Sequence, residues 1–158
     1  MTVVAIQQLA RNNVLQFFKD HWGSTEMVIS SGIYDCSKLD GFAYVDEDQT
    51  MVGLVTYIIH GETCEIISLD SIDGGKGIGS LLVQAVENIA VQNDCTLMTL
   101  ITTNDNLHAL GFYQKRGYYL VEIIQNAVEL ARAMKPEIPL IVDHGIPIRD
   151  EIILEKIL

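Results

Sequence analysis

The chain has 158 residues, a formal net charge of −11 and a hydrophobic content of 49%. This length fits one ordinary domain with a real core, and no apolar run approaches the roughly 20 residues that a membrane helix needs. The acidity disfavours nucleic acid, whose phosphates attract clustered Lys and Arg. It would favour a cationic partner, or it would serve solubility alone.

The N-terminus and the cysteines indicate a cytoplasmic protein. Residues 1–8 contain no basic region, and Arg11 follows the apolar stretch, which is the wrong order for a secretory signal. The three cysteines, Cys36, Cys64 and Cys95, form no Cys-x-x-Cys pair. Neither a zinc site nor a disulfide framework is therefore predicted, no metal is expected, and a reducing compartment fits best.

The first half of the chain predicts a strand, a helix and an antiparallel meander. Residues 2–7 form a short apolar run, and residues 10–22 place apolar side chains on one helical face ahead of Gly23. Segments rich in β-branched and aromatic residues follow at 41–45, 51–60 and 63–69. The polar segments between them are typical of turns, so we expect these strands to pair in sequence.

Beyond residue 77 the hydrophobic period becomes helical. Ile78 begins an apolar helical face that fades near Asn93. The pattern then predicts a strand at 96–101, a helix at 106–115, a strand at 118–124, a helix at 127–134 and a terminal strand at 151–158, after Pro147. This order predicts a mixed α/β fold in a single domain of residues 1–158, with residues 126–158 as a C-terminal extension packed on the same domain.

A glycine-rich turn, Gly74-Gly75-Lys76-Gly77-Ile78-Gly79, joins the third meander strand to the helix that follows. Glycines admit backbone conformations that other residues avoid, and a helix start offers unsatisfied N–H groups and a positive dipole end. A diphosphate is the natural ligand for such a turn, and Lys76 would add a charge. A tight turn without a ligand is the structural alternative.

Two common phosphate motifs do not fit this turn. The nucleotide P-loop requires Ser or Thr after its Gly-Lys pair, but Gly77 follows Lys76 here, and position 70, where its first glycine would stand, is Asp. The dinucleotide fingerprint begun at Gly75 would end at Ser80 rather than at a glycine. The turn therefore predicts an anion site of another kind.

The turn resembles the signature of the GNAT family of acyl-CoA N-acyltransferases, Arg/Gln-x-x-Gly-x-Gly/Ala, except that Gly74 replaces the usual Arg or Gln. A second family segment, Asn-x-x-Ala-x-x-Phe-Tyr-x-x-x-Gly-Phe, is matched by residues 106–118, with Tyr118 in place of the last Phe. Two motifs in the expected order are far more specific than either one alone. The resemblance is strongest over residues 51–124, and the Lys-Pro…Gly-Ile-Pro-Ile tail is similar to a subgroup of the family.

This resemblance implies a GNAT fold with an antiparallel N-terminal meander, splayed central strands and flanking helices. It also implies acetyl-CoA as cosubstrate, an amine-bearing acceptor, and neither nucleic acid nor membrane as partner, while a homodimer is allowed. The residues it assigns to acetyl-CoA are Leu69, Gly74, Gly75, Lys76, Gly77, Ile78, Gly79, Ser80, Asn106 and Tyr113.

The chemistry implied by the family assigns three catalytic roles and one binding role. The amide of Leu69 would polarise the thioester carbonyl, and Tyr113 would protonate the leaving thiolate, or would only pack beside the sulfur. Glu65 is the first candidate for the general base and Asp70 the second, and in a regular strand these two would point to opposite faces. Asn106 would contact the cofactor arm, cap its helix, or do both.

The sequence therefore predicts an acetyl-CoA-dependent N-acetyltransferase that works by direct transfer. A non-catalytic acyl-CoA sensor or interaction module with the same fold is the alternative. The Asn106 segment and Tyr113 favour the enzyme, whereas the missing Arg or Gln at Gly74 does not.

Overall fold

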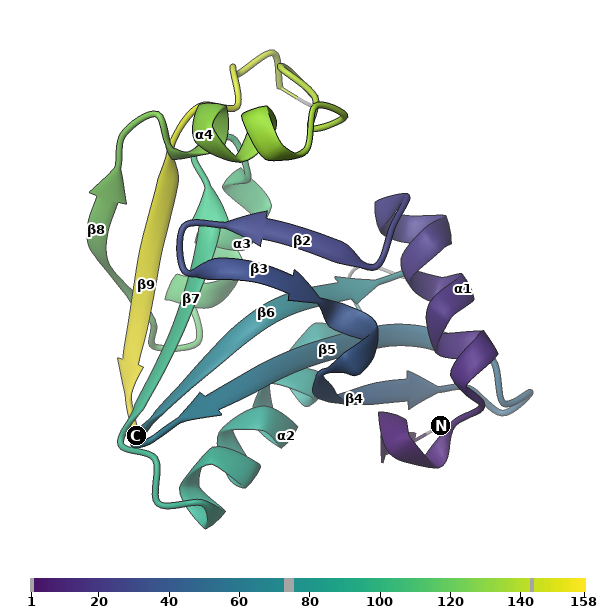
Figure 1. Cartoon of the computed structure of the whole chain (residues 1–158). Helices are drawn as coiled ribbons and strands as arrows, with labels where there is room; N and C mark the ends of the chain where they lie inside the picture. The colour runs from purple at the N-terminus through teal and green to yellow at the C-terminus, as the bar shows by residue number, and fades with distance from the viewer. Residues whose placement is uncertain (1, 73–75, 143) are drawn as a thin grey trace. The chain divides into compact units, whose positions relative to one another are not determined.

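The computed structural model describes residues 2–72, 76–142 and 144–158 (Figure 1). The chain forms two compact units. The first comprises Met1–Met27, Asp35–Met98 and Leu158, and the second comprises Val28–Tyr34 and Thr99–Ile157. The single domain expected from the sequence stays a prediction.

The first unit is built on a four-stranded antiparallel arrangement in the order β1-β4-β5-β6. Its strands are β1 (Thr2–Ala5), β4 (Asp40–Val45), β5 (Met51–His60) and β6 (Thr63–Ser71). Short 3-10 helices occupy Ile6–Gln8 and Cys36–Lys38. The meander predicted from the sequence is confirmed.

Two helices cover opposite faces of these strands (Figure 1). Helix α1 (Arg11–Trp22) ends at Gly23, whose left-handed φ of 74° closes the last turn. Helix α2 (Ile78–Gln92) packs on β4, β5 and β6 and buries Leu82, Val86 and Ala90 completely. The apolar face predicted for this helix is thus the one that meets the strands.

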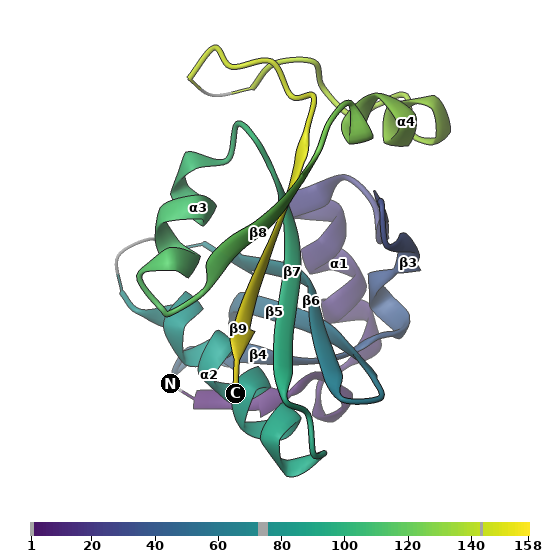
Figure 2. The ribbon, with the colours of Figure 1, turned by 90° about the vertical axis from the view of Figure 1, so that its left-hand side faces the viewer.

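The second unit contains β7 (Leu97–Thr103), whose first two residues belong to the first unit, together with α3 (Leu107–Gln114), β8 (Tyr119–Ile124), α4 (Ala127–Met134) and β9 (Glu151–Ile157). Its strands lie in the order β7-β9-β8, with β8 and β9 antiparallel (Figure 2). The chain-terminal strand therefore inserts between two strands that precede it in sequence. The mixed α/β fold is confirmed.

A short hairpin, β2 (Glu26–Ile29) and β3 (Gly32–Asp35), was not predicted. Each strand has four residues, which is too short for a clear alternation of apolar and polar side chains. The turn between them is Ser30-Ser31, which is not one of the strong hairpin dipeptides.

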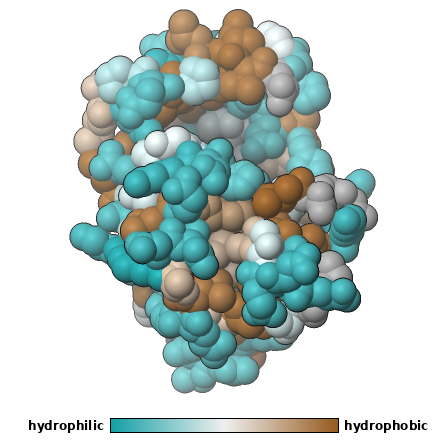
Figure 3. Space-filling view, turned by 90° about the vertical axis from the view of Figure 1, so that its right-hand side faces the viewer, coloured by the Kyte–Doolittle hydropathy of each residue, from teal (hydrophilic) through white to brown (hydrophobic). Residues whose placement is uncertain are grey.

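The second unit leaves many apolar side chains exposed. Figure 3 shows brown surface gathered over α4 and the loop after it. Exposed apolar residues there are Leu130, Met134, Leu140, Ile141 and Val142, and β8 adds Tyr119, Leu120, Val121 and Ile123. No helix among the described residues is both long and apolar enough to cross a membrane.

Candidate active site

The start of α2 is a helix end whose N-cap residue makes no side-chain capping bond. Gly77 is its N-cap residue, with a left-handed φ of 74° that glycine adopts readily. The first turn of the helix carries no acidic residue. Because the N–H groups and the positive dipole end are not opposed by a carboxylate of that turn, this end is suited to an anion.

Close packing fixes where α2 begins. A Cβ atom built on Gly53 of β5 would lie 2.7 Å from Cγ2 of Ile78 and 3.1 Å from Cδ1 of Leu82. The glycine therefore lets the first turn of the helix lie directly on the strand. Of the predicted turn, residues 76–79 are described and lead into this first turn of the helix, whereas Gly74 and Gly75 lie outside the described residues.

Strand β6, which leads into the turn, contains a β-bulge. On β5, Thr56 pairs with Ser68 and Tyr57 pairs with Ile66, which leaves Ile67 as an extra residue. The hydroxyl groups of Thr56 and Ser68 lie 2.6 Å apart in a buried hydrogen bond beside the bulge.

The bulge changes which carboxylates share a face. Glu65 lies opposite Ile58 and Asp70 lies opposite Leu54. Since residues 54 and 58 are on one face of β5, Glu65 and Asp70 also share a face. The expectation that they point to opposite faces is wrong, because it assumed a regular strand.

The amide of Leu69 points away from β5. The N–H of Ile72 donates to the carbonyl of Val52 at 2.9 Å, and N–H groups alternate between the two edges of a strand. The N–H of Asp70 therefore points toward β5, as that of Ile72 does, and the N–H of Leu69 points to the other edge of β6. Its N–H group lies outside the β5–β6 ladder, as the predicted role at a thioester carbonyl would require.

The two candidate bases have different surroundings. Glu65 is buried, with 6% of its surface exposed. Asp70 is half-buried, and its Oδ2 lies 3.3 Å from Nδ1 of His21, in the last turn of α1. Burial raises the pKa of Asp70, and the nearby His21 partly opposes that rise. No function was predicted for His21, because its pairing with Asp70 depends on which strand α1 packs against.

In the second unit, Asn106 caps the start of α3. Its side-chain Oδ1 accepts a hydrogen bond from the N–H of Ala109 at 3.1 Å. The capping role predicted for Asn106 is confirmed, whereas its contact with a cofactor arm stays a prediction. Gly111, in the middle of this helix, has open space around the position of a Cβ atom, and nothing in the structure explains it.

Tyr113 lies on the buried side of α3. Its ring meets the rings of Phe112 and Tyr118 edge-on, at centroid distances of 5.0 and 5.4 Å. Burial raises the pKa of its phenol, and Arg116 acts weakly in the opposite sense. The hydroxyl has no hydrogen-bond partner among the described residues. Every fully buried side-chain oxygen or nitrogen of those residues does have a partner, so the hydroxyl oxygen is not fully buried and reaches accessible space. Tyr113 is thus a protonated phenol with a free donor.

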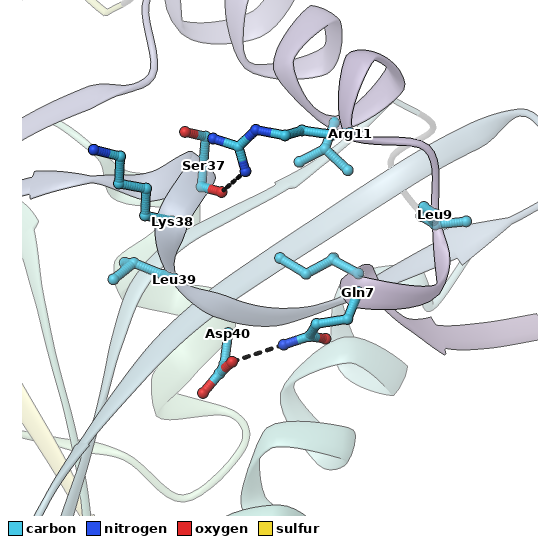
Figure 4. A pocket seen from close by; sticks show the side chains of 9 residues that line it. Gln7, Leu9, Arg11, Ser37, Lys38, Leu39 and Asp40 are labelled. Carbon is cyan, nitrogen blue, oxygen red and sulfur yellow. Dashed lines mark hydrogen bonds between the residues drawn. The ribbon is translucent and has the colours of Figure 1, made fainter.

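A separate cavity of about 400 Å³ lies in the first unit (Figure 4). Two hydrogen bonds border it, from Gln7 Nε2 to Asp40 Oδ1 at 2.7 Å and from Arg11 Nη1 to the carbonyl of Ser37 at 3.3 Å. Its lining includes none of the residues predicted for acetyl-CoA or catalysis. We therefore assign no role in the reaction to it.

Known proteins match this chain in sequence and in fold. Residues 10–118 match the acetyltransferase (GNAT) family. The protein YxbD of Bacillus subtilis (strain 168) is 53% identical over 156 residues, which cover 99% of this chain and 98% of the relative.

Solved structures agree with this match. An acetyltransferase from Bacillus subtilis in complex with CoA is similar with a TM-score of 0.69 at 17% identity, over 99% of this chain and 97% of that one. An aminoglycoside 6'-N-acetyltransferase complexed with coenzyme A gives a TM-score of 0.72 at 16% identity, with the same coverage of 99% and 97%. Taken with the motifs at residues 74–79 and 106–118, the family match shows that this chain belongs to the GNAT family, and the expected enzyme class, an N-acetyltransferase, is confirmed.

Proposed function

We propose that the protein transfers the acetyl group of acetyl-CoA to the amine of a small molecule or peptide by direct attack. The observation that carries the proposal is the start of α2, with Gly77 as its N-cap residue in a left-handed conformation and no acidic residue in the first turn. A diphosphate suits such a helix end. Because Gly74 stands in place of Arg or Gln, backbone N–H groups would provide most of the contacts to the diphosphate.

The reaction forms a C–N bond and breaks the C–S bond of the thioester. As the amine attacks, negative charge develops on the carbonyl oxygen, and the N–H of Leu69 would stabilise it. The proton leaving the amine would pass to Glu65 or, in second place, to Asp70, which His21 contacts. Tyr113 would give its proton to the departing CoA thiolate, and the free phenol donor described above supports this role.

Asn106 and the turn around Gly77 would contribute to the binding of acetyl-CoA. The capping bond occupies Oδ1 of Asn106, so the amide Nδ2 is the group that could donate to the cofactor arm. A side-chain amide has two N–H donors on that nitrogen. Capping and cofactor binding are thus compatible in one residue.

The proposal is tested in two steps. Calorimetry with acetyl-CoA and CoA should give dissociation constants of about 1 μM to 10 μM, equivalent to roughly 7–8 kcal/mol. Release of CoA should then accelerate with at least one member of a panel of amines, amino acids and N-terminal peptides. An absence of heat with both ligands would refute the proposal, whereas binding without turnover would favour the non-catalytic sensor.

We also propose a cytoplasmic location and a homodimer. All three cysteines, Cys36, Cys64 and Cys95, are buried and form no disulfide, which supports a reducing compartment. Burial raises the pKa of Cys64 to about 12, so its thiol stays protonated and unreactive. The exposed apolar residues of β8 support self-association, which light scattering at two concentrations would test.

A further inference from the structure

The end of α1 brings a histidine to the strand that carries the Leu69 amide. Nδ1 of His21 lies 3.3 Å from Oδ2 of Asp70, and Asp70 follows Leu69 directly in β6. These residues all belong to the first compact unit. The distance between the histidine and the proposed thioester position is therefore set within one unit of the fold.

The pair lies on the face of β6 that is turned away from α2. A Cβ atom on Gly53 would meet side chains of α2, so this residue of β5 faces that helix. The next pair along the ladder, Leu54 and Asp70, faces the opposite way, toward α1. Because α2 covers the first face, an acceptor that approaches Leu69 across the other face arrives beside Asp70.

The ring of His21 is held with one nitrogen toward Asp70. It packs against the ring of Phe17, a buried core residue one turn earlier in α1, with the two centroids 4.3 Å apart. The second nitrogen, Nε2, makes no hydrogen bond to a described residue. The side chains of His21 and Asp70 are 27% and 31% exposed, so an incoming group can reach the pair.

Glu65 shares this face but is less well placed for the same task. It lies opposite Ile58, three ladder positions from Val55, the partner of Leu69, which is roughly 10 Å along the strand. Glu65 is also buried, whereas His21 and Asp70 are partly exposed. The pair is therefore both closer to Leu69 and more open to an acceptor.

We propose that His21 is the catalytic base that takes the proton of the attacking amine, and that Asp70 positions it. This inference rests on the proposed function and assigns its proton step to His21 in place of Glu65. As the amine nitrogen forms its bond to the acetyl carbon, its proton passes to the imidazole ring, and the carboxylate of Asp70 stabilises the resulting imidazolium ion. The C–S bond breaks, the thiolate takes up a proton as proposed above, and water then removes the proton from His21.

The test uses an amine that accelerates CoA release from the unmodified protein. His21→Ala should lower kcat by about 100-fold, as loss of a general base does, and should leave the dissociation constant for acetyl-CoA unchanged. Added imidazole should restore part of this kcat, because it supplies the missing base in the space that the side chain leaves. His60→Ala, at the exposed end of β5, is the matched control and should keep the kcat of the unmodified protein.

Two further variants separate the base from its positioning residue. Asp70→Asn should lower kcat less than His21→Ala does, leave the KM for the amine unchanged and gain nothing from imidazole. His21→Asn keeps a polar group near the place of Nδ1 but has no second ring nitrogen, so it should lose as much kcat as His21→Ala. Melting temperatures show which variants are folded.

An unchanged kcat in both folded variants of His21, a loss that imidazole does not restore, or a larger loss in Asp70→Asn would overturn the inference. Each of these outcomes leaves turnover by the unmodified protein intact, so the proposed function would stand. An absence of turnover with every amine would instead refute the proposed function, and this inference with it.

Discussion

Helix α2 begins within the first family motif and helix α3 lies within the second, but the N-cap residues of the two helices differ. The N-cap residue of α2 is Gly77, which has no side chain to form a cap, whereas that of α3 is Asn106, whose side chain caps the helix. A helix whose end is closed by its own side chain is stable without a ligand. The end of α2, with a glycine as its N-cap residue, is the one for which we propose an anionic ligand. The comparison teaches that a helix start built on a glycine suits a ligand, whereas one built on an asparagine can be stabilised by its own side chain.

The largest expected effect concerns the group that α3 carries. Tyr113→Phe should lower kcat by about 100-fold or more, as loss of a general acid does, while the affinity for acetyl-CoA changes little. Because burial raises the pKa of Tyr113, the phenol remains protonated at neutral and mildly alkaline pH. Turnover of the unmodified protein should therefore show no loss from this group below about pH 10, the usual pKa of tyrosine. An unchanged kcat in the variant would remove the acid role.

The second effect concerns the open end of α2. Gly77→Ala places a residue with a side chain in a left-handed conformation, which costs about 1–2 kcal/mol. Because the backbone would relax from this conformation and turn the first N–H groups of α2 away from the diphosphate, the dissociation constant for CoA should rise about tenfold. Gly61→Ala is the matched control, since Gly61 has a φ of 60°, and both glycines have open space around a Cβ atom. The control should lose similar stability and keep its affinity for CoA. Equal affinities in both variants would contradict the assignment of the anion site.

Two substitutions at the closed end of α3 separate capping from binding. Asn106→Ala should lower the free energy of unfolding by about 1 kcal/mol, because the bond to Ala109 is lost. Asn106→Asp keeps an oxygen acceptor for that bond but loses the amide donors, so its stability should remain close to that of the unmodified protein. A weaker affinity for CoA in both variants, measured by calorimetry, would show that Nδ2 binds the cofactor. Unchanged affinity would leave Asn106 with capping alone.

The smallest effect is a gain in stability within α3. Gly111→Ala should raise the free energy of unfolding by about 0.5–1 kcal/mol, because alanine is the better helix former and its Cβ would meet open space. Gly53→Ala should have the opposite sign, since its Cβ would lie 2.7 Å from Ile78. Thermal melts of the two variants provide the comparison, and destabilisation by Gly111→Ala would mean that the glycine has a role not visible in the fold.

The long periodic elements could be predicted from the sequence, and the local irregularities could not. The apolar residues from Ile78 to Ile89 repeat with the period of an α-helix, which a strand would not show. Gly23 marks the end of α1. The hairpin at 26–35 was missed because its strands are four residues long. Ser30 and Glu151 are 121 positions apart, so their hydrogen bond left no local signal.

The bulge at Ile67 has a consequence for comparing this strand with related sequences. If β6 is aligned without a gap to a strand that lacks the bulge, the side chains on one side of Ile67 are assigned to the correct face of the sheet and those on the other side to the wrong face. A deletion of Ile67 would make Ile66 and Ser68 neighbours opposite their present partners, Tyr57 and Thr56, so both halves of β6 would keep their faces. A relative with one residue fewer between the positions of Glu65 and Asp70 is therefore expected to have a regular strand with the same side chains on each face.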